Sequence, residues 1–146
     1  GKHLFKEYWG NKSETKAAFS EEWFKTGDLA KMDEQHDVYI VGRKKEMIIS
    51  GGENIYPQEI EQCIIKHPNV KEVAVIGADD SYWGEVVTAF IVCYEEIDEF
   101  KEQIRAYCVQ QLAKYKIPKK IFILNELPKT TVGKIDKNRL KLQVTN

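Results

Sequence analysis

Two segments near the middle of the chain, Val70–Ile76 and Val86–Tyr94, are apolar on both faces and rich in β-branched residues. This pattern is typical of strands that are covered on both sides. The polar segment between them, residues 78–85, is predicted to be a loop. Further strands are predicted over four other segments: Trp23–Met32, Val38–Gly42, Met47–Ile49 and Ile117–Leu124. The first two of these flank a polar turn at 33–37 and predict a β-hairpin.

Apolar residues at helical spacing predict the helices. One helix starts at Pro57, which suits a first helical position, and runs up to Pro68. A longer amphipathic helix has one face formed by Ile97, Phe100, Ile104, Tyr107, Cys108 and Leu112. Short helices are expected over Ser13–Phe19 and Asp136–Leu142. The fold class that follows is α+β: a small mixed β-sheet flanked by about three helices, starting near residue 46 and preceded by the hairpin arm.

Length and composition narrow the class of protein. The chain has 146 residues, of which 42% are hydrophobic, enough for one core. Its longest nearly apolar run, Val86–Tyr94, is far shorter than a membrane span, and the first ten residues lack the apolar stretch of a secretory signal. Because the chain begins with Gly1, we expect it to start inside a longer protein. The three cysteines include no CxxC pair, so we expect reduced thiols in a cytoplasmic protein.

Charge is unevenly distributed although the net charge is only −1. Residues 114–146 carry nine basic and two acidic side chains, and this basic end is a candidate anion site. Its only aromatic residues are Tyr115 and Phe122, and no nucleic-acid-binding module is recognisable, so no nucleic-acid partner is expected. The histidines and cysteines are too scattered to predict a hydrolase triad or a metal site.

Four local features are each open to two interpretations. The loop Pro128–Ile135 lacks the first glycine and the final hydroxyl of a phosphate loop, so Lys134 is either an anion-binding lysine or a surface lysine. The glycines of residues 50–54, SGGEN, either form an anion-binding nest or simply turn the chain. Trp83 either stacks on a flat ligand or packs locally, and Asp28 either binds sugar hydroxyls or is a turn residue.

Read in order, these features form a larger pattern. WFKTGDLA, YIVGRKKEMIISGGENIYPQEIE, YKIPKKI and LPKTTVGKIDKNRL resemble the last part of the AMP-forming acyl-CoA synthetases, a family within the adenylate-forming superfamily. The resemblance covers nearly the whole chain. It implies an ATP-dependent acid–CoA ligase, in which a carboxylate first attacks ATP to form an acyl-adenylate and coenzyme A then displaces AMP.

The resemblance also implies roles for individual residues. Asp28 would bind the ribose of ATP, with Arg43 near the ribose and phosphate. Lys45 would be the hinge of the C-terminal domain, and Lys134, on a flexible loop, would be the catalytic lysine of adenylation. The channel for coenzyme A would include four residues: Gly51, Gly52, Trp83 and Lys119.

On this basis, residues 1–44 would end a large N-terminal domain and residues 45–146 would form a mobile C-terminal domain. That N-terminal domain is the expected partner, and it would bind most of the Mg²⁺ and the carboxylic acid, for which a fatty acid is expected ahead of an aryl acid. The chain by itself should therefore be inactive. His36, Lys25 and Glu46 depart from residues that are frequent in the family. Two alternatives remain: an adenylation domain that serves a carrier protein, and a non-catalytic binding module.

Overall fold

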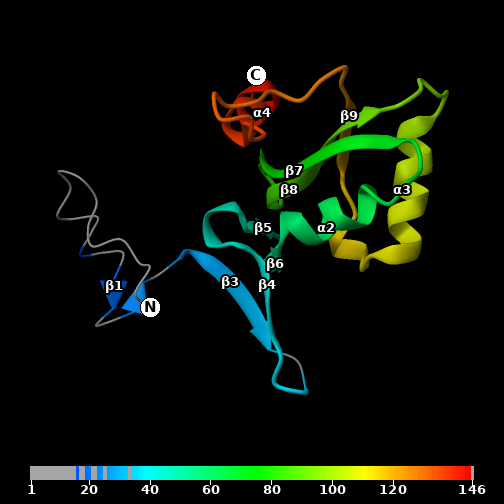
Figure 1. Cartoon of the computed structure of the whole chain (residues 1–146). Helices are drawn as coiled ribbons and strands as arrows, with labels where there is room; N and C mark the ends of the chain where they lie inside the picture. Colours follow the sequence, from blue (N-terminus) through cyan, green and yellow to red (C-terminus); the bar gives the residue numbers. More distant parts are fainter. Residues whose placement is uncertain (1–15, 17–18, 21–22, 25, 33, 146) are drawn as a thin grey trace.

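The computed structural model describes residues 16, 19–20, 23–24, 26–32 and 34–145 (Figure 1). The helix predicted over residues 13–19 lies largely outside these residues. Of its described positions, Lys16 is helical, whereas Phe19 lies in strand β1 (Phe19–Ser20). This strand pairs with β2 (Trp23–Phe24) in a two-stranded antiparallel sheet.

The predicted hairpin is confirmed, with one correction. Instead of one strand over 23–32, the chain leaves β2 at Phe24 and re-enters a strand only at β3 (Asp28–Met32). At the start of β3, the Thr26 hydroxyl accepts a hydrogen bond from the Asp28 N–H at 3.2 Å. Strand β3 then pairs antiparallel with β4 (Val38–Arg43), and this hairpin projects away from the rest of the molecule (Figure 1).

A mixed five-stranded sheet follows, and β8 (Gly84–Cys93) is its centre. One edge of β8 pairs antiparallel with β7 (Val70–Asp80) over the whole length of both strands. The other edge is shared: β5 (Ile48–Ser50) meets it antiparallel at Gly84, and β9 (Lys120–Ile123) runs parallel to it from Thr88 to Ile91. The fifth strand, β6 (Glu53–Ile55), pairs with β5.

The predicted loop over 78–85 is wrong at both ends. Strand β7 continues to Asp80 and β8 begins at Gly84, so only residues 81–83 form the turn. A carboxylate oxygen of Asp80 accepts the backbone N–H of Tyr82 at 3.0 Å and that of Trp83 at 2.9 Å. These bonds close the turn tightly and allow the ladder to extend into polar sequence.

Helices cover both faces of the sheet, as the apolar strands require. One face packs against α2 (Pro57–Ile64) and α3 (Phe100–Gln111), and the other packs against α4 (Lys137–Val144). Alternate residues of β7 divide between the two cores: Val73 and Val75 face α2 and α3, whereas Ala74 and Ile76 face α4. The α+β class, the mixed sheet and its three flanking helices are therefore confirmed.

Two buried cysteines lie where α2 and α3 meet. Burial raises the pKa of the Cys108 thiol to about 12, and neighbouring Cys63 adds to the shift. Both thiols are accordingly protonated at neutral pH, and they belong to the packing of the core.

Candidate functional site

The side chains of Asp28 and Arg43 form an ion pair at the base of the hairpin. The two residues are cross-strand partners on β3 and β4, and Arg43 Nε lies 2.7 Å from Asp28 Oδ1. The Arg43 guanidinium also donates to the Thr26 carbonyl oxygen at 3.3 Å. Asp28 is the more buried partner, with 21% of its side chain exposed against 62% for Arg43. A carboxylate held in this way keeps lone pairs that can accept hydrogen bonds from a ligand's hydroxyl groups.

A second group of predicted residues lines one groove. Gly51, Trp83 and Lys119 come from three separate segments, and the groove between them has a volume of 460 Å³. The Lys119 ammonium lies 3.4 Å from the centroid of the Trp83 ring, a close cation–π contact. Four residues that the sequence analysis did not select complete the lining: Ser50, Glu53, Lys114 and Tyr115.

At Gly51, any other residue would strain the backbone and displace the Trp83 ring. Its φ is +57°, and a Cβ atom added there would lie 2.8 Å from Cε3 of Trp83. The Gly51 N–H donates to the Trp83 carbonyl oxygen at 2.9 Å, so the two backbones are in direct contact. Gly52 is different: it is exposed in the turn before β6 and does not line the groove.

Asp80 is another residue that the sequence analysis missed, although its spacing before Tyr82 and Trp83 fits a side-chain-capped turn. The hydrogen bonds from the Trp83 and Tyr82 backbone N–H groups lower the pKa of the Asp80 carboxyl below its ordinary value. Asp80 thus holds the turn that presents the Trp83 ring to the groove.

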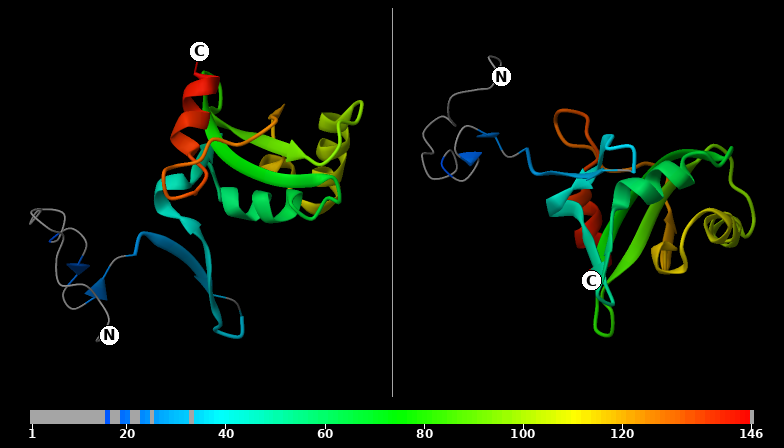
Figure 2. Two further views of the ribbon diagram at one scale, coloured as in Figure 1. Left: turned by 45° about the horizontal axis from the view of Figure 1, so that its top comes forward. Right: turned by 90° about the horizontal axis from the view of Figure 1, so that it is seen from below.

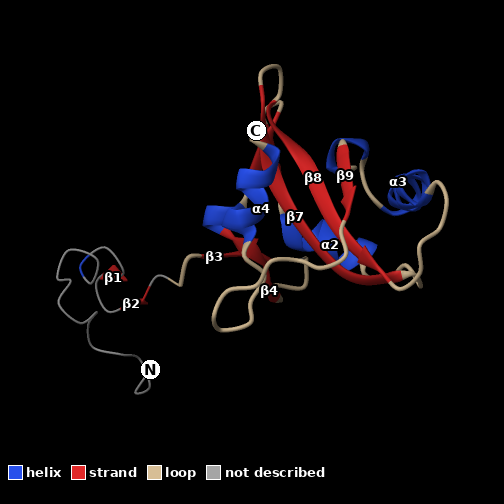
Figure 3. Cartoon of the chain, turned by 90° about the horizontal axis from the view of Figure 1, so that it is seen from above, coloured by secondary structure: helices blue, strands red, loops and turns tan. Residues whose placement is uncertain are grey.

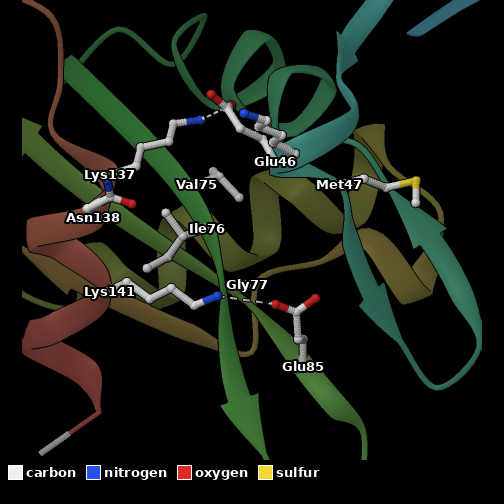
Figure 4. Close-up of a pocket in the computed structure, with 10 residues that line it drawn as sticks. Glu46, Met47, Val75, Ile76, Gly77, Glu85, Lys137, Asn138 and Lys141 are labelled. Atoms are coloured by element: carbon white, nitrogen blue, oxygen red, sulfur yellow. Dashed lines mark hydrogen bonds and ion pairs between the residues drawn. The ribbon is translucent and has the colours of Figure 1, made fainter. Parts of the chain in front are cut away.

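Lys45 lies in neither of these places. It is exposed in the short 3-10 helix Lys44–Glu46, which connects the hairpin to β5. Beside it is a small cavity of 140 Å³ that reaches β7 and α4 (Figure 4).

An ion-pair network surrounds this cavity. Lys137 Nζ lies 2.8 Å from Glu46 Oε2 and 2.9 Å from Glu61 Oε1, so α4 is joined to both the 3-10 helix and α2. Burial acts to lower the pKa of Lys137, but the two carboxylates outweigh it and the net shift is upward. On the other side of the cavity, Lys141 pairs with Glu85 at 3.6 Å (Figure 4).

Lys134 is exposed on a closely bonded turn. The Thr130 N–H donates to the Lys134 carbonyl oxygen at 2.7 Å, and the Thr130 hydroxyl accepts from the Lys134 N–H at 3.3 Å. Gly133, with φ +82°, closes the turn by donating to the Thr130 carbonyl oxygen at 2.9 Å. Lys134 is therefore presented on a small hairpin with a hydrogen-bonded backbone.

The loop that carries Lys134 and the turn between β7 and β8, next to the groove, lie toward opposite ends of the ladder; Figure 2 (right) shows the loop in orange and the turn in green. The turn is anchored beside Glu72 through Lys129, whereas the groove lies next to the pairing of Asp80 with Gly84. Eight residues of extended strand separate Glu72 from Asp80, which corresponds to about 26 Å. The structure thus brings Asp28 to Arg43, and Gly51 to Trp83 and Lys119, but it does not place Lys134 in the same groove.

Two negative findings apply to the described residues alone. Among them, no three side chains of His, Cys, Asp or Glu lie close enough together to hold a metal ion. None of the helices in this part of the chain is long and apolar enough to cross a membrane.

A family model and two ligases of known function match the sequence of this chain. The family model "AMP-binding enzyme C-terminal domain" matches residues 59–134. The chain is 52% identical over 134 residues to a 2-succinylbenzoate–CoA ligase of Listeria monocytogenes, covering 92% of this chain and 28% of the relative. It is 46% identical over 140 residues to a long-chain-fatty-acid–CoA ligase of Mycobacterium tuberculosis, covering 96% of this chain and again 28% of the relative.

A solved structure has the same fold. The o-succinylbenzoate CoA synthetase of Bacillus subtilis, in complex with its acyl-adenylate intermediate, matches 93% of this chain with a TM-score of 0.86 and 42% identity. The match covers 28% of that protein, so this chain spans little more than a quarter of the length of these relatives. With the family model covering more than half of its residues, the chain belongs to the family of AMP-binding enzyme C-terminal domains.

Proposed function

We propose that this chain is the C-terminal part of an ATP-dependent acid–CoA ligase, with residues 1–44 ending a larger domain and residues 45–146 forming a mobile one. The observation that carries the proposal is the separation of the Lys134 turn from the Trp83 groove at opposite ends of β7 and β8. One acyl group cannot meet both ends at once. A domain that rotates about Lys45, in the connecting 3-10 helix, would present them in turn.

In the first half-reaction, a carboxylate oxygen attacks the α-phosphorus of ATP and the bond to pyrophosphate breaks. Negative charge accumulates between the two anions in the transition state, and the exposed ammonium of Lys134 would stabilise it there. Asp28 would accept hydrogen bonds from the ribose hydroxyls, and Arg43, its ion-pair partner, would lie near the ribose and phosphate.

In the second half-reaction, the thiol sulfur of coenzyme A attacks the acyl carbon and AMP leaves. The thiol arm would pass the backbone at Gly51 and Gly52. The nucleotide end would use the groove, where the adenine ring can stack on Trp83 after Lys119 moves from that ring to a phosphate. The acid is proposed to be a fatty acid or an aryl acid, since ligases for both kinds are among the relatives.

The test uses the full-length protein and two separate assays. Lys134→Ala should slow pyrophosphate release by about 10²–10³-fold, because one charged donor to the transition state is lost. The rate of thioester formation from preformed acyl-adenylate should stay unchanged. Trp83→Ala should do the reverse, raising KM for coenzyme A without slowing adenylation. Lys101→Ala, an exposed lysine on α3, is the matched control.

A panel of fatty and aryl acids run with the wild-type protein would identify the substrate class. Thioester formation with a carrier protein but not with coenzyme A would favour a carrier-linked adenylation domain. Absence of adenylation with every acid, or loss of both half-reactions in each variant, would contradict the proposal.

A further inference from the structure

An ion pair to which the sequence analysis assigned no role ties the Lys134 turn to the sheet. Lys129, at the start of the turn, pairs with Glu72 of β7, which lies 57 positions earlier in the chain. Glu72 is on the face of β7 that also carries Ala74 and Ile76, the face packed against α4. In Figure 3 the loop after β9 crosses β7 on its way to α4.

The tether reaches Lys134 through the backbone of the turn. Lys129 forms a β-bridge with Ile135, the residue directly after Lys134. Ile135 in turn packs against the core beneath α4. The Asp136 N–H donates to the Pro128 carbonyl oxygen at 2.8 Å and closes the base of the turn. The position of Lys134 relative to β7 is therefore set by one ion pair, one packed side chain and the bridge between them.

Building on the proposed function, we propose that Glu72 is a positioning residue for acyl-adenylate formation, holding the Lys134 turn in place through Lys129. Both side chains are about one-third exposed, and ion pairs of this kind contribute little to the stability of a fold. Misplacing a catalytic group by about 1 Å can nevertheless cost about 100-fold in rate. The effect of the pair should thus fall on one half-reaction and leave folding almost unchanged.

The experiment is a charge-exchange cycle in the full-length protein. Glu72→Lys and Lys129→Glu should each slow pyrophosphate release by about 10-fold, and the double exchange should restore the rate to within about threefold. Thioester formation from preformed acyl-adenylate should stay constant, and Tm should shift by less than about 4 °C. Lys71→Glu, a charge reversal at the exposed neighbour of Glu72, is the matched control.

Amide hydrogen exchange of residues 129–136 tests the tether without requiring activity. Exchange should quicken in both single variants and return to the wild-type rate in the double exchange. Unchanged exchange, or an adenylation rate that the double exchange does not restore, would overturn the proposal. If exchange responds as expected but no acid is adenylated by the wild type, the proposed function fails and Glu72 has only a structural role.

Discussion

Gly51 and Gly52 are adjacent glycines with positive φ, yet the structure predicts different outcomes for replacing them. A Cβ atom at Gly51 would collide with Trp83, whereas at Gly52 it would meet no atom within 4 Å. Alanine at either position should lower the free energy of unfolding by about 1 kcal/mol through backbone strain. Only Gly51→Ala should also displace the Trp83 ring. The indole N–H resonance of Trp83, assigned with Trp83→Phe, should move in Gly51→Ala and stay in place in Gly52→Ala.

The stability of the turn that carries Trp83 should depend on pH through the Asp80 carboxyl. Backbone hydrogen bonds lower the pKa of this carboxyl in the folded state, so the folded protein holds fewer protons than the unfolded one. Its stabilising effect is present above the ordinary pKa of 3.8 and is lost as the pH falls through the lowered value.

The measurement is Trp83 fluorescence, taken as the difference between the protein and its Trp83→Phe variant. The difference signal should change with a midpoint below pH 3.8, and Asp80→Asn should remove that transition. A midpoint above 3.8 would show that another group controls the turn.

Among the secondary-structure elements, α4 depends on Lys137 for its attachment to the 3-10 helix and to α2. Lys137→Met keeps most of the aliphatic stem but leaves the Glu46 and Glu61 carboxylates without their cation. We expect the free energy of unfolding to fall by about 2 kcal/mol, measured by urea denaturation at pH 7. Lys141→Met, on the same helix, should cost less than about 1 kcal/mol because its ion pair is longer and more exposed. Equal losses for the two variants would contradict this role of Lys137.

The ion pairs of Lys137 also predict that the attachment of α4 weakens at high pH. Because the pKa of Lys137 is raised in the folded state, its contribution to stability is complete at neutral pH and is lost as the pH rises through the raised value, above 10.5. The wild-type protein should therefore lose more stability than Lys137→Met between pH 9 and pH 12.

The predicted elements that were correct share a local signal. The runs of β-branched residues in β7 and β8 and the spacing after Pro57 are each contained within about a dozen residues, and the structure has strands and a helix there. Strand β6 has no such signal, since its three residues are held by pairing with β5. The extension of β7 to Asp80 was missed because it depends on a side chain that bonds the following turn.

The candidate site was predictable only in part, because its parts are distant in sequence. The resemblance of the motifs predicted Gly51, Gly52, Trp83 and Lys119 as a set. All but Gly52 line one groove, and their meeting there depends on the pairing of β8 with two other segments. Lys114 and Tyr115 enter the same groove from the turn before β9, and no periodicity along the chain marks them. The ion pair between Lys129 of the Lys134 turn and Glu72 was not predicted for a similar reason, since Glu72 lies far away in the chain, on β7.

At the scale of the whole molecule, the distribution of core residues predicts that residues 45–146 fold without residues 1–44. Among the residues that the structure describes, every member of the two hydrophobic clusters lies between Ile48 and Val144. We expect a protein of residues 45–146 to unfold cooperatively when monitored by circular dichroism, with a Tm close to that of the complete chain. Starting at Pro57 instead removes buried Ile48 and Ile55 and should abolish the transition.

A noncooperative melt of residues 45–146 would instead place the domain boundary earlier in the chain. The hairpin would then belong to the same folding unit as the sheet, contrary to the proposed division at Lys45.

The edge of β8 that β5 and β9 share sets the width of the groove. One wall of the groove is set where the Gly51 N–H bonds the Trp83 carbonyl, and the other where the Lys119 N–H bonds the carbonyl of Val87. Trp83, directly before β8, and Val87, in β8, are four positions apart, about 13 Å at the usual rise of a strand. The distance between the two walls is thus set by two backbone hydrogen bonds. Substitutions at Lys114, Tyr115 or Glu53 should therefore alter what the groove prefers to bind without altering its width.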